Sequence, residues 1–264
     1  MERSTLRAFL VAISLVSVLL PTGLRAQPEN TSPAPAASVL KPYKAVYSAK
    51  YNGMDVKAVR ELTALESGFS ISSNIKGMLG SVSEEERFHI DGQGDIQPDR
   101  YRMRKSFFGM DREEKFDVDP STRLGVFTRK DKRRELTLLP EHLGPVSYQL
   151  QMRRDLEIAS QPARGAELAG QTFSYPVFSR GKIRDYRFEV LGWEETETGI
   201  GTVSTLKLQR VRDKGKRKTL FWMAPAWNFV IVKIQQHEKG GEQYEMILEK
   251  ASIEGMAAAP ASSN

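Results

Sequence analysis

Cysteine is absent from the 264-residue chain, and histidine occurs only three times. Without cysteine the protein can form no disulfide, no thiolate metal site and no thiol nucleophile. His89, His142 and His237 lie far apart in the sequence, and we expect them on the surface or in loops. The sequence contains neither G-x-S-x-G nor a metal-ligating pattern such as H-x-H or H-E-x-x-H. We therefore predict no catalytic residue, no metal site and no cofactor.

Long apolar runs are missing after the first 26 residues. Met1–Arg7 is short and basic, Ala8–Leu20 is apolar apart from two serines, and Pro21 ends the run shortly before Ala26. This order is typical of a secretory signal peptide, with cleavage near Ala26. A transmembrane anchor is the alternative, but about thirteen apolar residues are fewer than the roughly 20 that a spanning helix needs. We expect a periplasmic or secreted protein with no transmembrane span after cleavage and, lacking cysteine, no N-terminal lipid.

The charge is only mildly positive, at +6 for the whole chain at pH 7. Two basic stretches, Arg129–Arg134 and Arg212–Lys218, contain no interleaved aromatic residues and are typical of solvated hairpin tips. Nucleic acid is not an expected partner behind a signal peptide. An anionic lipid or polysaccharide remains an alternative partner for these stretches.

A period of two residues dominates the sequence between residues 41 and 254, where turn residues separate the apolar and polar alternation. About a dozen strands with short connections predict an all-β, mainly antiparallel fold: a strongly curved sheet, an open barrel or a sandwich. The domain organisation that we expect is a signal peptide 1–26, a flexible linker 27–40, a single β-rich domain 41–254 and a disordered tail 255–264. Strands are expected at Tyr43–Tyr51, Met54–Glu66, Phe69–Lys76, Val82–Asp91, Asp99–Phe108, Met110–Asp119, Leu124–Arg129, Thr172–Ser179, Ile183–Trp193, Thr202–Arg210, Lys218–Met223, Phe229–His237 and Tyr244–Ile253.

One segment departs from the alternation. In the stretch 144–156, Tyr148, Met152 and Leu156 are four residues apart, and Pro145 stands where the first turn of a helix accepts proline. The spacing predicts one short helix near 145–156, between two groups of strands.

Three neighbouring strands carry charged residues in the middle of otherwise apolar alternate sets. These residues are Glu84, Glu86, Lys105, Arg112 and Glu114. If these faces point inward, the charges meet inside the curve and need each other, water or a ligand, because an unpaired buried charge is costly. One interpretation is a polar, water-filled concavity that binds a ligand. The other is a sheet that is wet on both faces or shifted by a bulge.

The most distinctive local string is FWMAPAWNF at residues 221–229, where Pro225 predicts a turn between two strands. Trp222 and Trp227 are candidates for flanking the mouth of a pocket. The alternative is that both close one end of the core.

Around this string, strand and turn patterns follow a recognisable order: YRFEVLGWEE at 186–195, TVSTLKLQRVRD at 202–213, TLFWMAP at 219–225 and VIVKIQQHEKGGEQYEMIL at 230–248. Together with the opening strand YKAVYSAKYNGMDV at 43–56, this order resembles the domain of unknown function 3108 (DUF3108) family of exported bacterial proteins. The chain departs from the family after Pro225, where Trp227-Asn228-Phe229 stands at the usual approach to a second proline. The resemblance implies an antiparallel β fold and an envelope location, and it implies no established activity.

Export, β structure and the missing catalytic set favour a non-enzymatic protein that binds or escorts an envelope lipid, glycan or protein segment on a concave sheet. A second hypothesis is a hydrolase acting on an envelope polymer through Glu84, Glu86 and Glu114. A third is a structural interaction module, which would expose an apolar patch or a free strand edge.

Overall fold

The computed structural model describes residues 40–51, 54–78, 80–161, 167–212, 217–237 and 243–259. The expected signal peptide 1–26 and all of the expected linker except Leu40 lie outside the described residues.

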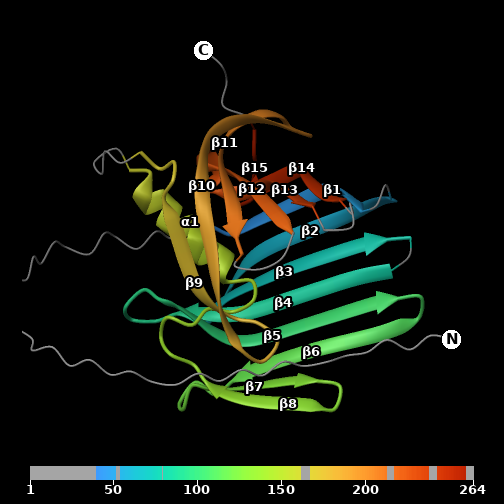
Figure 1. Cartoon of the computed structure of the whole chain (residues 1–264), viewed down its shortest axis with the longest axis vertical. Coiled ribbons are helices and arrows are strands. Elements are labelled where there is room, and N and C mark those ends of the chain that lie inside the picture. The colour runs from blue at the N-terminus through green and yellow to red at the C-terminus, as the bar shows by residue number, and fades with distance from the viewer. Residues whose placement is uncertain are drawn as a thin grey trace, which may run out of the picture. The chain divides into compact units, whose positions relative to one another are not determined.

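Within these ranges the chain forms a single antiparallel sheet of fifteen strands (Figure 1). The first half contributes β1 (Tyr43–Tyr51), β2 (Met54–Leu65), β3 (Gly68–Gly77), β4 (Gly80–Ile90), β5 (Ile96–Phe107), β6 (Met110–Val118), β7 (Leu124–Arg129) and β8 (Lys132–Thr137). The second half contributes β9 (Thr172–Phe178), β10 (Ile183–Thr198), β11 (Gly201–Val211), β12 (Lys218–Ala224), β13 (Val230–His237), β14 (Gln243–Ile253) and β15 (Met256–Ala257).

The topology is a chain of hairpins closed in the middle by one long-range pairing. β1 pairs with both β2 and β14, which joins the two halves, and β8 and β9 end the path. The sheet is therefore open, and the prediction of an antiparallel, strongly curved sheet is confirmed. β8 was not predicted, because KRRELT is charged and exposed and shows no apolar alternation. The basic stretch Arg129–Arg134 belongs to the β7–β8 hairpin.

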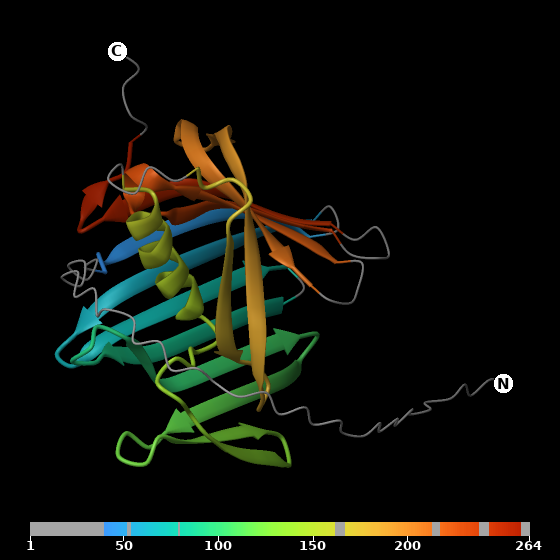
Figure 2. The same ribbon diagram turned by 60° about the vertical axis from the view of Figure 1, so that its left-hand side comes forward.

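The sheet curls so that its last strands cover the concave face of its first strands. β9 and β10 cross in front of the layer formed by β1–β8 in both views (Figures 1 and 2). Phe178, at the end of β9, stacks on Phe116 of β6 with 3.7 Å between ring centroids, and its ring lies 5.7 Å from that of Phe127 in β7. These contacts bury aromatic rings from both halves in one core, which is the main source of stability for such a fold.

One α-helix, α1 (Tyr148–Ala159), lies inside the curve (Figure 2). The predicted helix near 145–156 is therefore present but begins later, because Ser147 is the N-cap and Pro145 precedes it. Leu150, Met152 and Leu156 are fully buried, and they fill the space between the helix and the concave face.

Glu86 of β4 links the N-terminus of α1 to the sheet through hydrogen bonds. Its side chain is 0% exposed, and one carboxylate oxygen accepts hydrogen bonds from the backbone N–H groups of Val146, at 2.7 Å, and Ser147, at 3.0 Å. A Cβ on Gly144 would lie 1.8 Å from the other oxygen, so only glycine permits this close approach. A carboxylate placed here is favoured by the free N–H groups at the start of the helix.

The end of the described chain is more ordered than predicted. Within the expected tail 255–264, β15 pairs with β14, and Ala257 lies opposite Ser252. Residues 260–264 lie outside the described residues.

The burial of Glu86 makes the stability of the protein dependent on pH. Burial raises the pKa of this carboxyl from 4.5 to about 7, in spite of the hydrogen bonds from Ser147 and Val146. The folded state therefore binds the proton more tightly than the unfolded chain, so this stabilisation is present below pH 4.5 and is lost as the pH rises through 7. On lowering the pH from 8 to 5.5, we expect the free energy of unfolding to rise by about 2 kcal/mol relative to Glu86→Gln.

The measurement is urea unfolding of both proteins across this pH range. Glu85→Gln is the control, because the pKa of Glu85 is lowered mainly by the hydrogen bond from Arg87 and its titration falls below the range. Parallel pH profiles for the wild type and Glu86→Gln would contradict the prediction.

Candidate functional site

The register places all five predicted charged residues on the concave face of the sheet. Glu84 lies opposite Met103, which lies opposite Glu114, and Lys105 lies opposite Arg112. Glu86 follows Glu84 by two residues and lies opposite Ile71, whose side chain is in the core. Since residues two apart share a face of a strand, all five side chains belong to the face that carries the core.

The three acids of this set have separate structural partners. Glu84 accepts a hydrogen bond from the hydroxyl of Tyr101 at 2.6 Å, Glu86 holds α1, and Glu114 pairs with Arg129 at 3.3 Å. Lys105 is half-buried and Arg112 is exposed, since both lie nearer to the ends of their strands. The expectation that all five charges meet inside the curve is therefore not met.

Trp222 and Trp227 are core residues, with 4% and 6% of their surfaces exposed. The indole N–H of Trp222 donates to Glu194, and the ammonium groups of Lys207 and Lys233 lie 4.8 and 5.1 Å from the ring centroid. Trp227 ends a 3-10 helix, η2 (Pro225–Trp227). Both tryptophans are therefore part of the core, as the alternative interpretation held, and they do not lie exposed at the mouth of a pocket.

A different set of charges lines the interior. Arg60 of β2 lies on the concave face, because it is opposite Ser73, which is opposite Glu84. The Nε of Arg60 donates to the hydroxyl of Tyr43 at 3.1 Å. The guanidinium of Arg153, from α1, lies 4.8 Å from the centroid of the same tyrosine ring. Two cations from the helix and the sheet therefore meet at one aromatic side chain.

Two further arginines approach from the other half of the sheet. Arg210 of β11 lies opposite the buried Phe188 and stacks on Tyr186, with its guanidinium carbon 3.5 Å from the ring centroid. Tyr186 contacts Tyr148 of α1 edge to face, with the ring centroids 5.2 Å apart. Arg212 follows Arg210 by two residues, at the end of β11. We call Arg60, Arg153, Arg210 and Arg212 the arginine cluster.

Electrostatic effects link the members of the arginine cluster. The pKa of Arg153 is lowered by burial and, in the same direction, by the charge of Arg60. The pKa of Arg212 is lowered by burial and by the charge of Arg210. Burial raises the pKa of the Tyr148 hydroxyl, whereas Arg210 and Arg60 act to lower it. The charges of these arginines therefore influence the pKa values of neighbouring members of the cluster and of Tyr148.

Part of the hydrogen-bonding capacity of the cluster is unused. Arg153 is 4% exposed; its Nε donates to the backbone oxygen of Asn228 at 2.7 Å, while its Nη1 has no partner. The Nε of Arg212 is also buried without a partner. Throughout the described ranges, no salt bridge joins a carboxylate to Arg60, Arg153, Arg210 or Arg212. The cluster thus presents buried cationic donors to an interior lined by tyrosines.

Sequence reasoning missed this cluster although a signal was present. Arg60 stands between Ala58 and Leu62, and Arg210 follows Leu208, in phase with side chains that the structure buries. An arginine in phase with an apolar set predicts a buried cation, but the pattern cannot show which cations the fold brings together. Arg212 was assigned to a solvated hairpin tip because of its basic neighbours.

The arrangement suits the recognition of an anion. Guanidinium groups present planar sets of donors that match phosphate and carboxylate oxygens, and buried donors without partners favour an anionic acceptor. Among the described residues, no group of three or more His, Asp and Glu side chains could hold a metal ion. The described helices also include none with the length and apolar character needed to cross a membrane.

Comparisons with known proteins place the chain in a family. A crystal structure of a Bacteroides fragilis protein, described as exported and as having a YmcC-like fold, is similar over 80% of this chain and 95% of its own, with 11% identity and a TM-score of 0.30. A crystal structure of a Parabacteroides distasonis protein, described as a lipoprotein, is similar over 81% of this chain and 96% of its own, with 14% identity and a TM-score of 0.32. The comparison with curated proteins found no match. Residues 46–249 match the family described as a protein of unknown function, DUF3108, and the chain belongs to that family.

Proposed function

We propose that this protein is an exported, non-enzymatic binding protein that holds an anionic component of the cell envelope on the concave face of its sheet. The observation that carries the proposal is the arginine cluster, in which buried guanidinium donors have no carboxylate partner among the described residues. Export rests on the signal-peptide pattern of residues 1–26.

In the unbound protein, the burial of Arg153 costs free energy. A buried cation that no salt bridge neutralises is unfavourable. The charge of Glu157 offsets the burial of Arg153 only in part, since the pKa of Arg153 remains lowered, so a fold that needed only stability would have an apolar residue or an ion pair there. A bound phosphate or carboxylate would supply both the missing charge and the missing acceptors. Tyr43, Tyr148 and Tyr186 offer ring faces and hydroxyls beside the cations, which suits an anionic group attached to an apolar or sugar moiety.

The contacts of the acids give no support to the hydrolase hypothesis. A glycosidase needs one protonated and one ionised carboxyl on either side of the substrate. Glu86 instead accepts the N–H groups at the start of α1, and Glu114 pairs with Arg129. The edge of the sheet at β8 does not favour an interaction module that adds strands, since β8 carries Lys132, Arg133 and Glu135.

Ligand binding tests the proposal directly. We expect at least one of three anionic probes, short-chain phosphatidylglycerol, decanoate or a uronic acid oligosaccharide, to bind more tightly than its neutral counterpart in calorimetric titrations. We expect Arg60→Gln/Arg153→Gln to weaken that binding at least tenfold, because each lost charged hydrogen bond is worth roughly 1.5–3 kcal/mol. Arg104→Gln is the control, since Arg104 is exposed and lies 3.7 Å from Glu113. Equal affinities in the wild type and the double variant, or no preference for any anionic probe, would contradict the proposal.

The unbound protein gives an independent test of the same assignment. If Arg153 serves a ligand, Arg153→Gln should leave the free energy of unfolding within about 1 kcal/mol of the wild type or raise it, because a buried unpaired charge is removed while a donor to Asn228 is retained. Chemical denaturation at pH 7 measures this difference. A loss of about 3 kcal/mol or more would indicate a structural role for Arg153.

A further inference from the structure

Large apolar side chains are exposed together at one end of strands β3–β6. Met78 is 94% exposed, Phe108 75%, Met110 71% and Phe107 43%. The register makes them neighbours: Gly77 lies opposite Gly80, Gly80 opposite Phe107, and Phe107 opposite Met110. We call Met78, Phe107, Phe108 and Met110 the tip surface. Contiguous exposed apolar side chains mark protein or membrane interaction sites.

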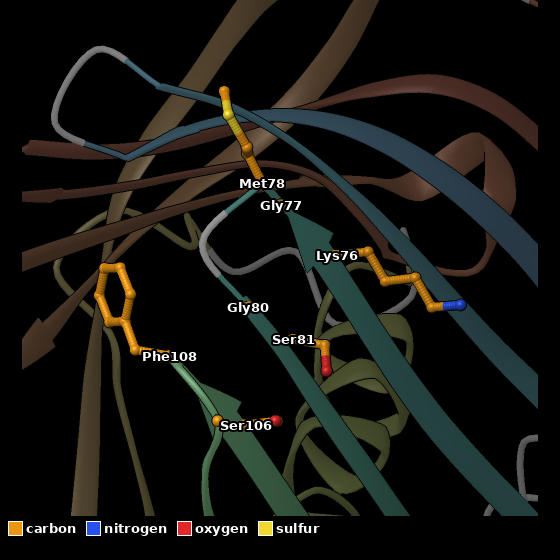
Figure 3. Close-up of a pocket in the computed structure, with 8 residues that line it drawn as sticks. Lys76, Gly77, Met78, Gly80, Ser81, Ser106 and Phe108 are labelled. Atoms are coloured by element: carbon orange, nitrogen blue, oxygen red, sulfur yellow. The ribbon is translucent and has the colours of Figure 1, made fainter.

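The two hairpins that carry the tip surface are in close contact. A Cβ on Gly80 would lie 2.1 Å from the carbonyl oxygen of Ser106, so the absence of a side chain lets the tips approach each other. Figure 3 shows Met78 and Phe108 on the neighbouring tips, with Gly80 and Ser81 at the start of β4. Between them lies a hollow of about 500 Å³.

Phe108 contributes little to the fold that presents it. Phe108 and Gly109 have φ angles of +49° and +74°, the left-handed values that a tight hairpin turn requires at both central positions. Asparagine or glycine is preferred at the first of these positions, and a bulky residue is unfavourable there. An aromatic residue that is both solvent-exposed and placed in an unfavourable conformation points to a role outside folding.

Cations lie directly behind the tip surface. Lys57 is opposite Lys76, and Lys105 is opposite Arg112, so like charges face each other across two strand pairs. Cross-strand pairs of like charge are unfavourable in an isolated domain. In the part of the chain that the structure describes, no salt bridge neutralises any of these four residues. Asp111, opposite Ser106, and Asp55, two residues before Lys57, add negative charges nearby.

We propose that the tip surface docks this protein on an anionic phospholipid bilayer. Met78, Phe107, Phe108 and Met110 enter the interface between headgroups and acyl chains, and the cations behind them contact the anionic headgroups. Apolar side chains with flanking lysine and arginine are the combination that binds such a surface. The inference goes beyond the proposed function and does not rest on the arginine cluster.

Vesicle flotation tests the docking. The protein, purified after export, is mixed with vesicles of phosphatidylcholine containing one quarter phosphatidylglycerol, or of phosphatidylcholine alone, at low and high salt. We expect the wild type to float with the anionic vesicles at low salt and to be released by high salt or by the loss of phosphatidylglycerol. Met78→Ser/Phe108→Asn should reduce the bound fraction at least fivefold without lowering the melting temperature, since asparagine suits the turn.

The matched control is Trp193→Ser/Met256→Ser, which removes an aromatic residue and a methionine that are 53% and 70% exposed elsewhere on the surface. It should float like the wild type. Lys105→Gln/Arg112→Gln should weaken flotation and reduce its dependence on salt. Equal binding to both vesicle types, or equal losses in the tip and control variants, would overturn the docking. Loss of flotation in Arg60→Gln/Arg153→Gln but not in the tip variant would also overturn it, and would assign lipid binding to the arginine cluster.

Discussion

A strongly curved, open sheet has a concave face that the chain itself must cover, and the rest of this structure depends on that covering. The alternation of apolar residues continues through both halves, so the inner face of β1–β7 is apolar over much of its length. The chain covers it by folding α1 and β9–β11 into the curve, with Phe178 against Phe116 and Leu150 in the core. Glu86 fixes where α1 begins, because its carboxylate satisfies N–H groups that the helix cannot satisfy internally.

The charged groups inside the curve are not fully matched by partners. Each interior acid has a structural partner, although one oxygen of Glu86 has none, and the arginine cluster has buried donors without partners. On the same concave face, toward the ends of β5 and β6, Lys105 lies opposite Val82 and Arg112. These two cations lie behind the exposed apolar tip surface. The two features differ in burial and in chemistry, yet both favour an anionic partner, and the envelope location that we propose would offer such partners in lipids and acidic glycans.

The fold was largely predictable because alternation and turn residues are local. The thirteen predicted strands are present, and the predicted helix is displaced by only a few residues because Ser147, and not the proline before it, caps it. β8 was missed because a charged edge strand lacks a buried face. The site was less predictable: alternation places Glu84 and Glu114 on one face, but only the curvature decides that one meets Tyr101 and the other Arg129. Arg153 joins Arg60 through the packing of a helix on a sheet, which no local pattern encodes.

The most direct test of the central claim is to observe the arginine side chains themselves. Arginine Nε–H resonances can be followed by NMR in the ¹⁵N-labelled protein while the tightest-binding anionic probe is titrated in. We expect the Arg60 and Arg153 resonances to shift first and to saturate together, at concentrations where exposed arginines such as Arg104 and Arg112 are unchanged. Shifts confined to the exposed arginines, with those of Arg60 and Arg153 constant, would contradict it.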